Sequence, residues 1–123
     1  MEGARPPQPL VLLVDDHDDT CAGYATYLRL CDMNVVTCGS AEDALDLLES
    51  TAPDAIVSDL KLPGLSGVEL LAALSDDPLR ARIPFVLLTG YPMAKPPAAA
   101  CLLQKPVRPA RLLDELRRAL GLP

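Results

Sequence analysis

Aromatic side chains are scarce in this sequence, which has three Tyr, one Phe and no Trp among 123 residues. Since 50% of the residues are hydrophobic, we expect a core built from Leu, Val, Ile and Ala. No apolar run reaches the roughly 20 residues of a membrane-spanning helix, and the N-terminus "MEGARPPQP" lacks the apolar centre of a signal peptide. We therefore expect a cytoplasmic protein that has no membrane partner.

The sequence also has few basic residues and lacks the Cys and His patterns that bind zinc. The chain has 11 Lys and Arg against 17 Asp and Glu, and its net charge of −6 argues against nucleic acid as a direct ligand. This balance suits a metal cation or a basic partner. The four cysteines form no C-x-x-C pair and the chain has one His, so a zinc site is not expected. We expect the cysteines to be reduced and to serve as small hydrophobic residues.

Segments with two hydrophobic periods alternate along the chain. Five mostly apolar runs are typical of strands buried on both faces: 10–14, 34–38, 54–59, 83–90 and 101–104. Stretches between them carry apolar residues at helical spacing, such as Cys21, Tyr24, Ala25 and Leu28. This alternation within 123 residues predicts one α/β domain, a parallel sheet with helices on both faces. The Pro-rich residues 1–9 are expected to be a short disordered lead-in.

Charged and polar side chains stand at the ends of these predicted strands. Asp15 and Asp16 follow the first strand, Asp59 ends the third, Thr89 lies in the fourth near its end, and Lys105 follows the fifth. Ligands of an open parallel sheet bind beyond the carboxyl ends of its strands, so these side chains are expected to converge. Three clustered carboxylates need a cation, and oxygen ligands suit Mg²⁺ or Mn²⁺. The ammonium and hydroxyl groups suit a phosphoryl group, which an Asp can accept.

Five motifs in this order resemble the receiver domain of bacterial two-component response regulators. They are the acidic pair 15–16, Asp59 in "VSDLKLPG", Gly67 in "LSGVEL", Thr89 in "LLTG", and Lys105-Pro106. The resemblance covers nearly the whole chain and implies a receiver domain over residues 10–121. It also implies a flavodoxin-like fold, a doubly wound five-stranded parallel sheet with strand order 2-1-3-4-5 and helices on both faces.

The resemblance implies a Mg²⁺ site made by four residues. Asp16 and Asp59 would ligate the ion directly, Asp15 would act through a water molecule, and the backbone carbonyl of Lys61 would complete the protein ligands.

The resemblance also implies a phosphoryl-transfer role. Asp59 would accept the phosphoryl group from a histidine kinase or a histidine phosphotransfer protein. Lys105 would pair with Asp59 and then with a phosphoryl oxygen, and Thr89 would turn its hydroxyl toward the same group. The Lys105-Pro106 peptide would be cis. Such a domain catalyses its own phosphorylation and dephosphorylation without being a stand-alone enzyme, and it signals by binding a downstream protein whose identity the sequence does not reveal.

The chain departs from this family between Thr89 and Lys105. Receiver domains usually place a full helix there, but residues 90–104 contain Pro92, Pro96 and Pro97, and proline breaks helix interiors. We predict that this helix is missing or cut to one turn near residues 97–100. The family's signalling aromatic is replaced by Leu102, so its usual coupling to the threonine is not expected. Because the output face looks altered, dimerisation through it is not expected and a monomer is favoured.

Two other functions fit parts of the sequence, which is compatible with a stand-alone receiver and with a piece of a larger protein. "DHDDT" (16–20) also matches the signature of haloacid-dehalogenase-like phosphatases, in which Asp16 would be the nucleophile. A degenerate receiver could also serve as a phosphorylation-independent scaffold. Among the neighbouring residues, Asp18 and Asp19 are expected in the first turn of a helix, where acids complement the helix dipole. His17 is expected to be a solvated loop residue.

Overall fold

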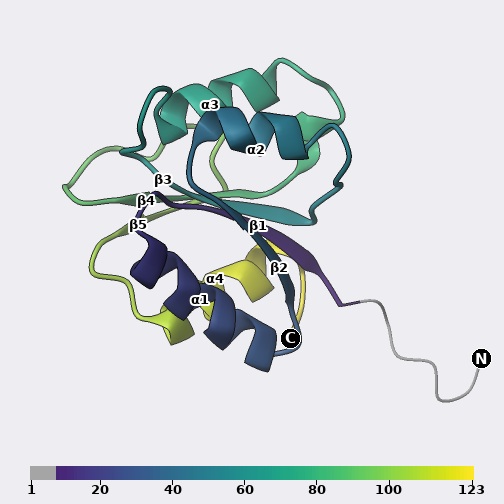
Figure 1. Cartoon of the computed structure of the whole chain (residues 1–123), viewed down its shortest axis with the longest axis vertical. Coiled ribbons are helices and arrows are strands. Elements are labelled where there is room, and N and C mark those ends of the chain that lie inside the picture. The colour runs from purple at the N-terminus through teal and green to yellow at the C-terminus, as the bar shows by residue number, and fades with distance from the viewer. Residues whose placement is uncertain (1–7) are drawn as a thin grey trace, which may run out of the picture.

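The computed structural model describes residues 8–123 and contains one five-stranded parallel sheet (Figure 1). Its strands are β1 (Leu10–Val14), β2 (Asn34–Cys38), β3 (Ala55–Asp59), β4 (Phe85–Thr89) and β5 (Cys101–Gln104). They pair in the order β2-β1-β3-β4-β5, which confirms the predicted topology. The expected lead-in falls on residues outside the described part of the chain, apart from Gln8 and Pro9.

Two layers of helices enclose the sheet (Figure 1). One face is covered by α1 (Asp18–Leu30) and α4 (Pro109–Ala119), and the other by α2 (Ala41–Leu47) and α3 (Gly67–Ser75). A short 3-10 helix, Arg80–Arg82, precedes β4 and was not predicted. No helix among the described residues is long and apolar enough to cross a bilayer.

Local side chains explain where the helices begin and end. Ser40 and Ser66 each accept a hydrogen bond from the backbone N–H three residues later, and the Glu69 carboxylate accepts one from the N–H of Ser66. Helix α4 starts at Pro109, whose missing N–H costs nothing in the first turn. It ends before Gly121, which adopts a positive φ of 70° that suits glycine.

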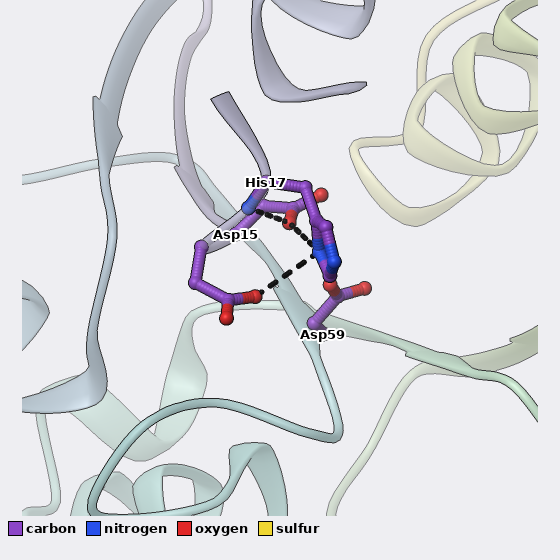
Figure 2. A group of neighbouring side chains, drawn as sticks. Asp15, His17 and Asp59 are labelled. Atoms are coloured by element: carbon purple, nitrogen blue, oxygen red, sulfur yellow. Dashed lines mark hydrogen bonds and ion pairs between the residues drawn. The ribbon is translucent and has the colours of Figure 1, made fainter. Parts of the chain in front are cut away.

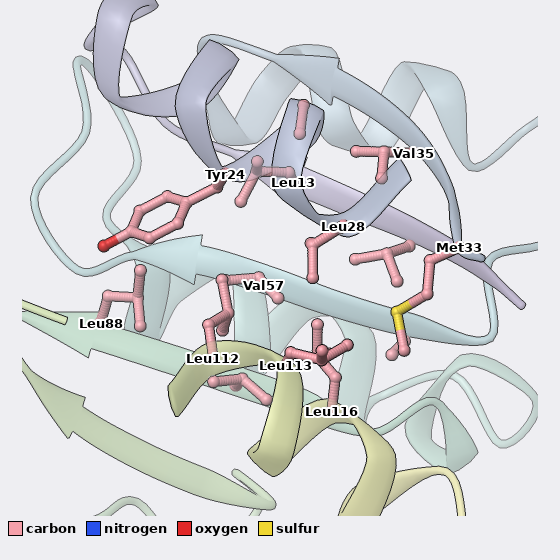
Figure 3. Packing of buried hydrophobic residues seen from close by; sticks show 14 of the residues in the cluster. Leu13, Tyr24, Leu28, Met33, Val35, Val57, Leu88, Leu112, Leu113 and Leu116 are labelled. Atoms are coloured by element: carbon pink, nitrogen blue, oxygen red, sulfur yellow. The ribbon is translucent and has the colours of Figure 1, made fainter. Parts of the chain in front are cut away.

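The core is aliphatic, as predicted, and it lies on both sides of the sheet. On the α1/α4 side, Leu13 and Val57 from the sheet pack against Leu28 of α1 and Leu112 and Leu116 of α4 (Figure 3). A second cluster lies under α2 and α3. Each large side chain buried in this way stabilises the fold by about 1.5–3 kcal/mol. All four cysteines lie in the described residues and are free, which agrees with their predicted reduced state.

The predicted loss of a helix between β4 and β5 is confirmed. Residues 90–100 form an irregular segment whose only regular feature is a turn at residues 97–98. The N–H of Ala99 donates to Pro96 O, and the N–H of Ala100 donates to Phe85 O. Lys95 Nζ donates to the carbonyl oxygens of Ala99 (2.6 Å) and Pro96 (3.2 Å). Backbone contacts and one lysine thus hold the segment where the family usually has a helix.

Candidate functional site

Three of the strand ends bring their charged residues to one edge of the sheet. Asp15 directly follows β1 and Asp59 ends β3, and both are almost fully buried, at 3% and 2% exposure. The N–H of Asp15 donates to Cys38 O of β2 at 3.0 Å. Lys105 follows β5, and its N–H donates to Thr89 O at 2.7 Å. Sheet pairing therefore extends one residue past the strands and sets the positions of these side chains.

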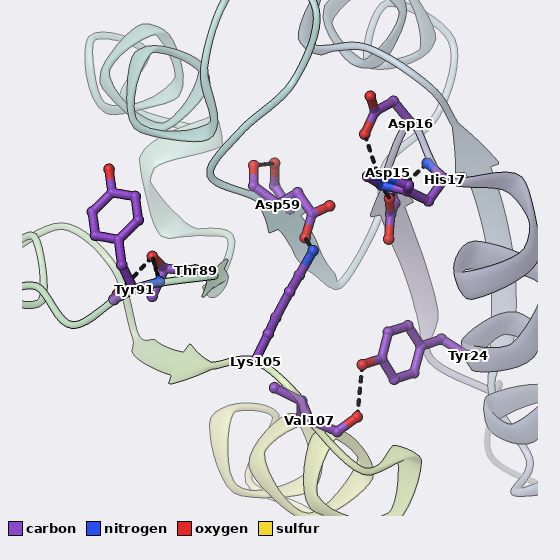
Figure 4. A network of polar contacts seen from close by, with 10 residues as sticks. Asp15, Asp16, His17, Tyr24, Asp59, Thr89, Tyr91, Lys105 and Val107 are labelled. Atoms are coloured by element: carbon purple, nitrogen blue, oxygen red, sulfur yellow. Dashed lines mark hydrogen bonds and ion pairs between the residues drawn. The ribbon is translucent and has the colours of Figure 1, made fainter.

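Lys105 and Asp59 form a close ion pair (Figure 4), in which Nζ lies 2.6 Å from Oδ1. Burial is the main cause that raises the pKa of Asp59 to about 6, and the neighbouring Asp15 carboxylate raises it further. The ion pair with Lys105 lowers the same pKa, but it does not outweigh burial. Asp59 is therefore a buried carboxylate that still ionises near neutral pH. The Lys105-Pro106 peptide that follows is cis, as predicted.

Four side chains form a cluster of metal-ligating atoms at this edge (Figure 2). Asp15, Asp16, His17 and Asp59 each offer one such atom, and these atoms lie within 4.8 Å of one another. Asp15 Oδ1 accepts a hydrogen bond from the N–H of His17 at 2.9 Å. Asp15 Oδ2 is buried and has no hydrogen-bond partner among the described residues. Leaving a buried carboxylate oxygen without a donor is costly, so this oxygen fits a site for a divalent cation.

The sequence did not predict the role of His17 in this cluster. Its side chain is 70% exposed, yet its Nδ1 lies 3.2 Å from Asp16 Oδ1 and 3.4 Å from Asp15 Oδ1 (Figure 4). The only signal in the sequence was its position directly after the acidic pair. Asp18 and Asp19 lie in the first turn of α1, as predicted, and outside the cluster.

Thr89 ends β4 and is 1% exposed. Its hydroxyl donates to Tyr91 O at 2.9 Å and accepts from the N–H of Tyr91 at 3.2 Å (Figure 4). The hydroxyl is thus engaged by the start of the irregular 90–100 segment and makes no hydrogen bond to Asp59. The ring of Tyr91 is exposed, at 58%.

A cleft of about 510 Å³ opens over the acidic cluster. Its walls include Asp16, His17, Lys61, Tyr91 and Lys105. Lys61 therefore borders the site as expected, while the use of its backbone carbonyl as a ligand stays a prediction.

Gly67, one of the predicted motif residues, packs directly against the backbone of Asp59. It is the first residue of α3, and its N–H donates to Leu60 O at 2.8 Å. A Cβ atom at this position would collide with the backbone oxygen of Asp59 and lie 2.9 Å from Leu87 Cδ1. Only glycine therefore lets α3 begin this close to the end of β3.

The sequence profile of the response regulator receiver domain matches residues 11–117. The chain is 34% identical over 119 residues to the C4-dicarboxylate transport transcriptional regulatory protein DctD of Pseudomonas aeruginosa. That alignment covers 92% of this chain but 25% of DctD, so the chain spans about a quarter of that relative.

Two solved structures share the fold. The chemotaxis response regulator CheY4 of Vibrio cholerae superposes with a TM-score of 0.84 at 26% identity, covering 92% of this chain and 99% of that one. The receiver domain of the sensor histidine kinase PA1611 from Pseudomonas aeruginosa PAO1 gives a TM-score of 0.83 at 24% identity, with 93% and 98% covered. The PA1611 structure has a magnesium ion coordinated in its active site cleft.

Proposed function

This chain belongs to the response regulator receiver domain family, and we propose that it accepts a phosphoryl group on Asp59 in a two-component or phosphorelay system. The observation that carries the proposal is the buried Asp59 carboxylate, held 2.6 Å from Lys105 and beside Asp15. A nucleophilic carboxylate needs to be ionised, desolvated and next to a cation that can receive charge. Asp59 meets these needs better than Asp16, whose side chain is 38% exposed.

The carboxylates of the cluster would hold Mg²⁺ or Mn²⁺. Asp16 and Asp59 would ligate the ion directly, Asp15 through a water molecule, and Lys61 through its carbonyl. The unpartnered Oδ2 of Asp15 supports this assignment, because a nearby cation would offset its burial. When bound, the ion would neutralise charge on the carboxylates and on the transferred group. The magnesium ion in the PA1611 receiver domain belongs to a structure of the same fold.

The chain's own residues would carry out the transfer as follows. An oxygen of Asp59 would attack the phosphorus of a phosphohistidine, forming a P–O bond while the P–N bond breaks and the electron pair leaves with the imidazole. Lys105 would move its ammonium group from Asp59 Oδ1 to a phosphoryl oxygen. Thr89 would give up its two hydrogen bonds to Tyr91 and donate to the same group. Water would later hydrolyse the acyl phosphate and restore Asp59.

We therefore assign a role as a self-phosphorylating signalling domain and not as a stand-alone enzyme. The donor would be a histidine kinase or a histidine phosphotransfer protein, and the output would be binding of a downstream protein. The monomeric state and the cytoplasmic location stay predictions.

Intact-mass measurement after incubation with Mg²⁺ and acetyl phosphate tests the proposal. The parent, Asp59→Ala, Asp16→Ala and, as a matched control, Asp19→Ala would be compared, since Asp19 is exposed and lies outside the cluster. We expect a phosphoryl adduct in the parent and in Asp19→Ala, none in Asp59→Ala, and a reduced amount in Asp16→Ala. Borohydride trapping and peptide mapping would locate it.

Each alternative function predicts a different result. An adduct on Asp16 that survives Asp59→Ala would support the phosphatase mechanism and contradict ours. A parent protein that neither binds Mg²⁺ nor accepts phosphoryl from acetyl phosphate or from a kinase would be a scaffold.

A further inference from the structure

We infer that His17 is an additional ligand of this metal site and that its imidazole shifts the preference of the site from Mg²⁺ toward first-row transition-metal dications. The inference rests on the proposed function in one respect, namely that a divalent ion binds among Asp15, Asp16 and Asp59. It goes beyond that function by adding a nitrogen donor to a site otherwise made of oxygen ligands.

The distances fit a shared ion. Octahedral metal–ligand bonds of about 2.1 Å place neighbouring ligand atoms about 3.0 Å apart and opposite ones about 4.2 Å apart. His17 Nδ1 lies 3.2 Å from Asp16 Oδ1 and 3.4 Å from Asp15 Oδ1 (Figure 4), close to the spacing of neighbouring ligands. The donor atoms of all four residues lie within 4.8 Å of one another, so small side-chain shifts would bring them around one ion.

The backbone holds His17 in this position. It is the N-cap residue of α1, with φ −95° and ψ 102°, and its N–H donates to Asp15 Oδ1. Its side chain makes no capping hydrogen bond to the helix. The imidazole is thus free of any structural task in α1, and its Nδ1 points toward the acids at the mouth of the cleft (Figure 4).

A second observation indicates that a ligand belongs between these groups. Asp15 Oδ2 is buried without a hydrogen-bond partner in the described residues, and the Asp15 side chain is 1% exposed. The exposed imidazole does not satisfy this oxygen, because its contact is with Oδ1. A cation placed among the four donor atoms would satisfy this oxygen.

The nitrogen donor has a chemical consequence. Imidazole suits transition-metal dications such as Co²⁺, Ni²⁺ and Zn²⁺, whereas Mg²⁺ prefers oxygen ligands and water. His17 should therefore strengthen Co²⁺ binding much more than Mg²⁺ binding.

Isothermal titration calorimetry of the untagged full chain with Co²⁺ and with Mg²⁺ tests the inference. In His17→Ala we expect the ratio of Co²⁺ to Mg²⁺ affinity to fall by about tenfold or more, since even groups that only orient a ligand change metal affinity by 10–100-fold. Asp18→Ala is the matched control: it alters the next residue and removes a charge outside the cluster, so both affinities should change together and the ratio should hold.

A spectroscopic measurement addresses coordination directly. His17 is the only His in the chain, so a hyperfine-shifted, solvent-exchangeable imidazole N–H resonance in the NMR spectrum of the Co²⁺-loaded protein would come from it. We expect this resonance in the parent and not in His17→Ala. Because the His17 side chain does not cap α1, the variant should keep the parent's circular dichroism spectrum.

The possible outcomes separate this inference from the proposed function. An unchanged Co²⁺/Mg²⁺ ratio, or an equal loss for both ions without the shifted resonance, would overturn the role of His17 while leaving phosphorylation of Asp59 intact. Failure of the parent to bind either ion would overturn both this inference and the metal-dependent part of the proposed function.

Discussion

The acidic edge of the sheet and the 90–100 segment, which joins β4 to β5, are held in place by different kinds of contact. At the acidic edge, Asp15, Asp59 and Lys105 are held by sheet hydrogen bonds and by close packing of α3 against β3. A few residues away, the 90–100 segment has no helix and depends on a turn, on Lys95 and on Ala99, which is buried. The first region is thus held by the packed sheet, while the second is an irregular segment without a helix.

Thr89 is the point where these two regions meet. It ends β4 beside the acidic edge, yet its hydroxyl is bonded to Tyr91 at the start of the irregular segment. If Thr89 turns toward a phosphoryl group, Tyr91 loses both of these hydrogen bonds. Under the proposed function, the signal would then enter an irregular segment and not a helix.

Crowding behind Asp59 should make Gly67→Ala the most damaging change. The added Cβ meets the backbone oxygen of Asp59 and the side chain of Leu87, and neither is free to move away. Overpacking of this kind costs about 1–3 kcal/mol, and we expect a loss near the upper end, about 3 kcal/mol, together with slower phosphorylation. Urea unfolding monitored by circular dichroism measures the first effect.

Gly23→Ala is the matched control for that prediction. Gly23 lies in α1, is exposed, and has nothing within 4 Å of an added Cβ. Alanine is favoured over glycine in a helix by about 0.5–1 kcal/mol, so this variant should be more stable than the parent. If both alanine variants had the same stability, the close packing of α3 on β3 would not be what holds the acidic edge.

Because the Asp59 charge is buried, we predict that Asp59→Asn stabilises the fold by an amount that depends on pH. Because folding raises the pKa of Asp59 from 3.8 to about 6, the folded protein binds this proton more tightly than the unfolded chain. The parent therefore loses stability as the pH rises from 3.8 to about 6, and Asn does not. At about 1.4 kcal/mol for each pKa unit, the variant should be more stable by about 3 kcal/mol above that range.

Chemical denaturation in metal-free buffer, at pH values below 3.8 and above 6, measures this difference. We expect the two proteins to differ little at the lower pH and clearly at the higher one. Added Mg²⁺ should reduce the difference, because a bound cation favours the ionised carboxylate. A parent that is more stable than Asp59→Asn at the higher pH would show that Lys105 compensates for burial fully.

Much of the acidic edge could be predicted because strand ends can be located from hydrophobic runs alone. The run 10–14 placed Asp15 at the edge, and the run through residue 59 placed Asp59 beside it. The prolines at 92, 96 and 97 likewise predicted the missing helix, since their effect is local.

Features that depend on local backbone and side-chain geometry, and not on a hydrophobic period, could not be predicted. The direction of the His17 ring depends on its contacts with Asp15 and Asp16, which no hydrophobic pattern encodes. The hydrogen bonds of Thr89 to Tyr91 depend on how the irregular segment leaves β4. The 3-10 helix Arg80–Arg82 is too short to leave a hydrophobic period in the sequence.

A change at the loop after Lys105 should have an intermediate effect on the free energy of unfolding. Tyr24 of α1 is buried, and its hydroxyl donates to Val107 O at 2.7 Å (Figure 4). Tyr24→Phe leaves this carbonyl without its donor, so we expect a loss of about 1 kcal/mol in unfolding free energy. Tyr27→Phe is the control, because Tyr27 packs beside the same core without a side-chain hydrogen bond among the described residues. Equal effects of the two changes would mean that this hydrogen bond adds nothing.

The smallest effect on global stability is expected from Lys95→Ala. Within the irregular segment, however, this change should clearly speed hydrogen exchange. Its ammonium group donates to Ala99 O and Pro96 O and thereby closes the 95–99 turn. In the unfolded chain these groups bond to water instead, so the net stabilisation is small. We therefore expect the free energy of unfolding to fall by only about 0.5 kcal/mol. Hydrogen exchange at Ala99 and Ala100 should nevertheless speed up several-fold, while exchange at Asp59 and Asp15 stays unchanged. Lys61→Ala, which removes an exposed lysine from the cleft wall, serves as the control and should leave exchange in the segment as it is in the parent. If Lys95→Ala also speeded exchange at Asp59, the two regions would be mechanically coupled, and the segment would help to hold the acidic edge that it borders.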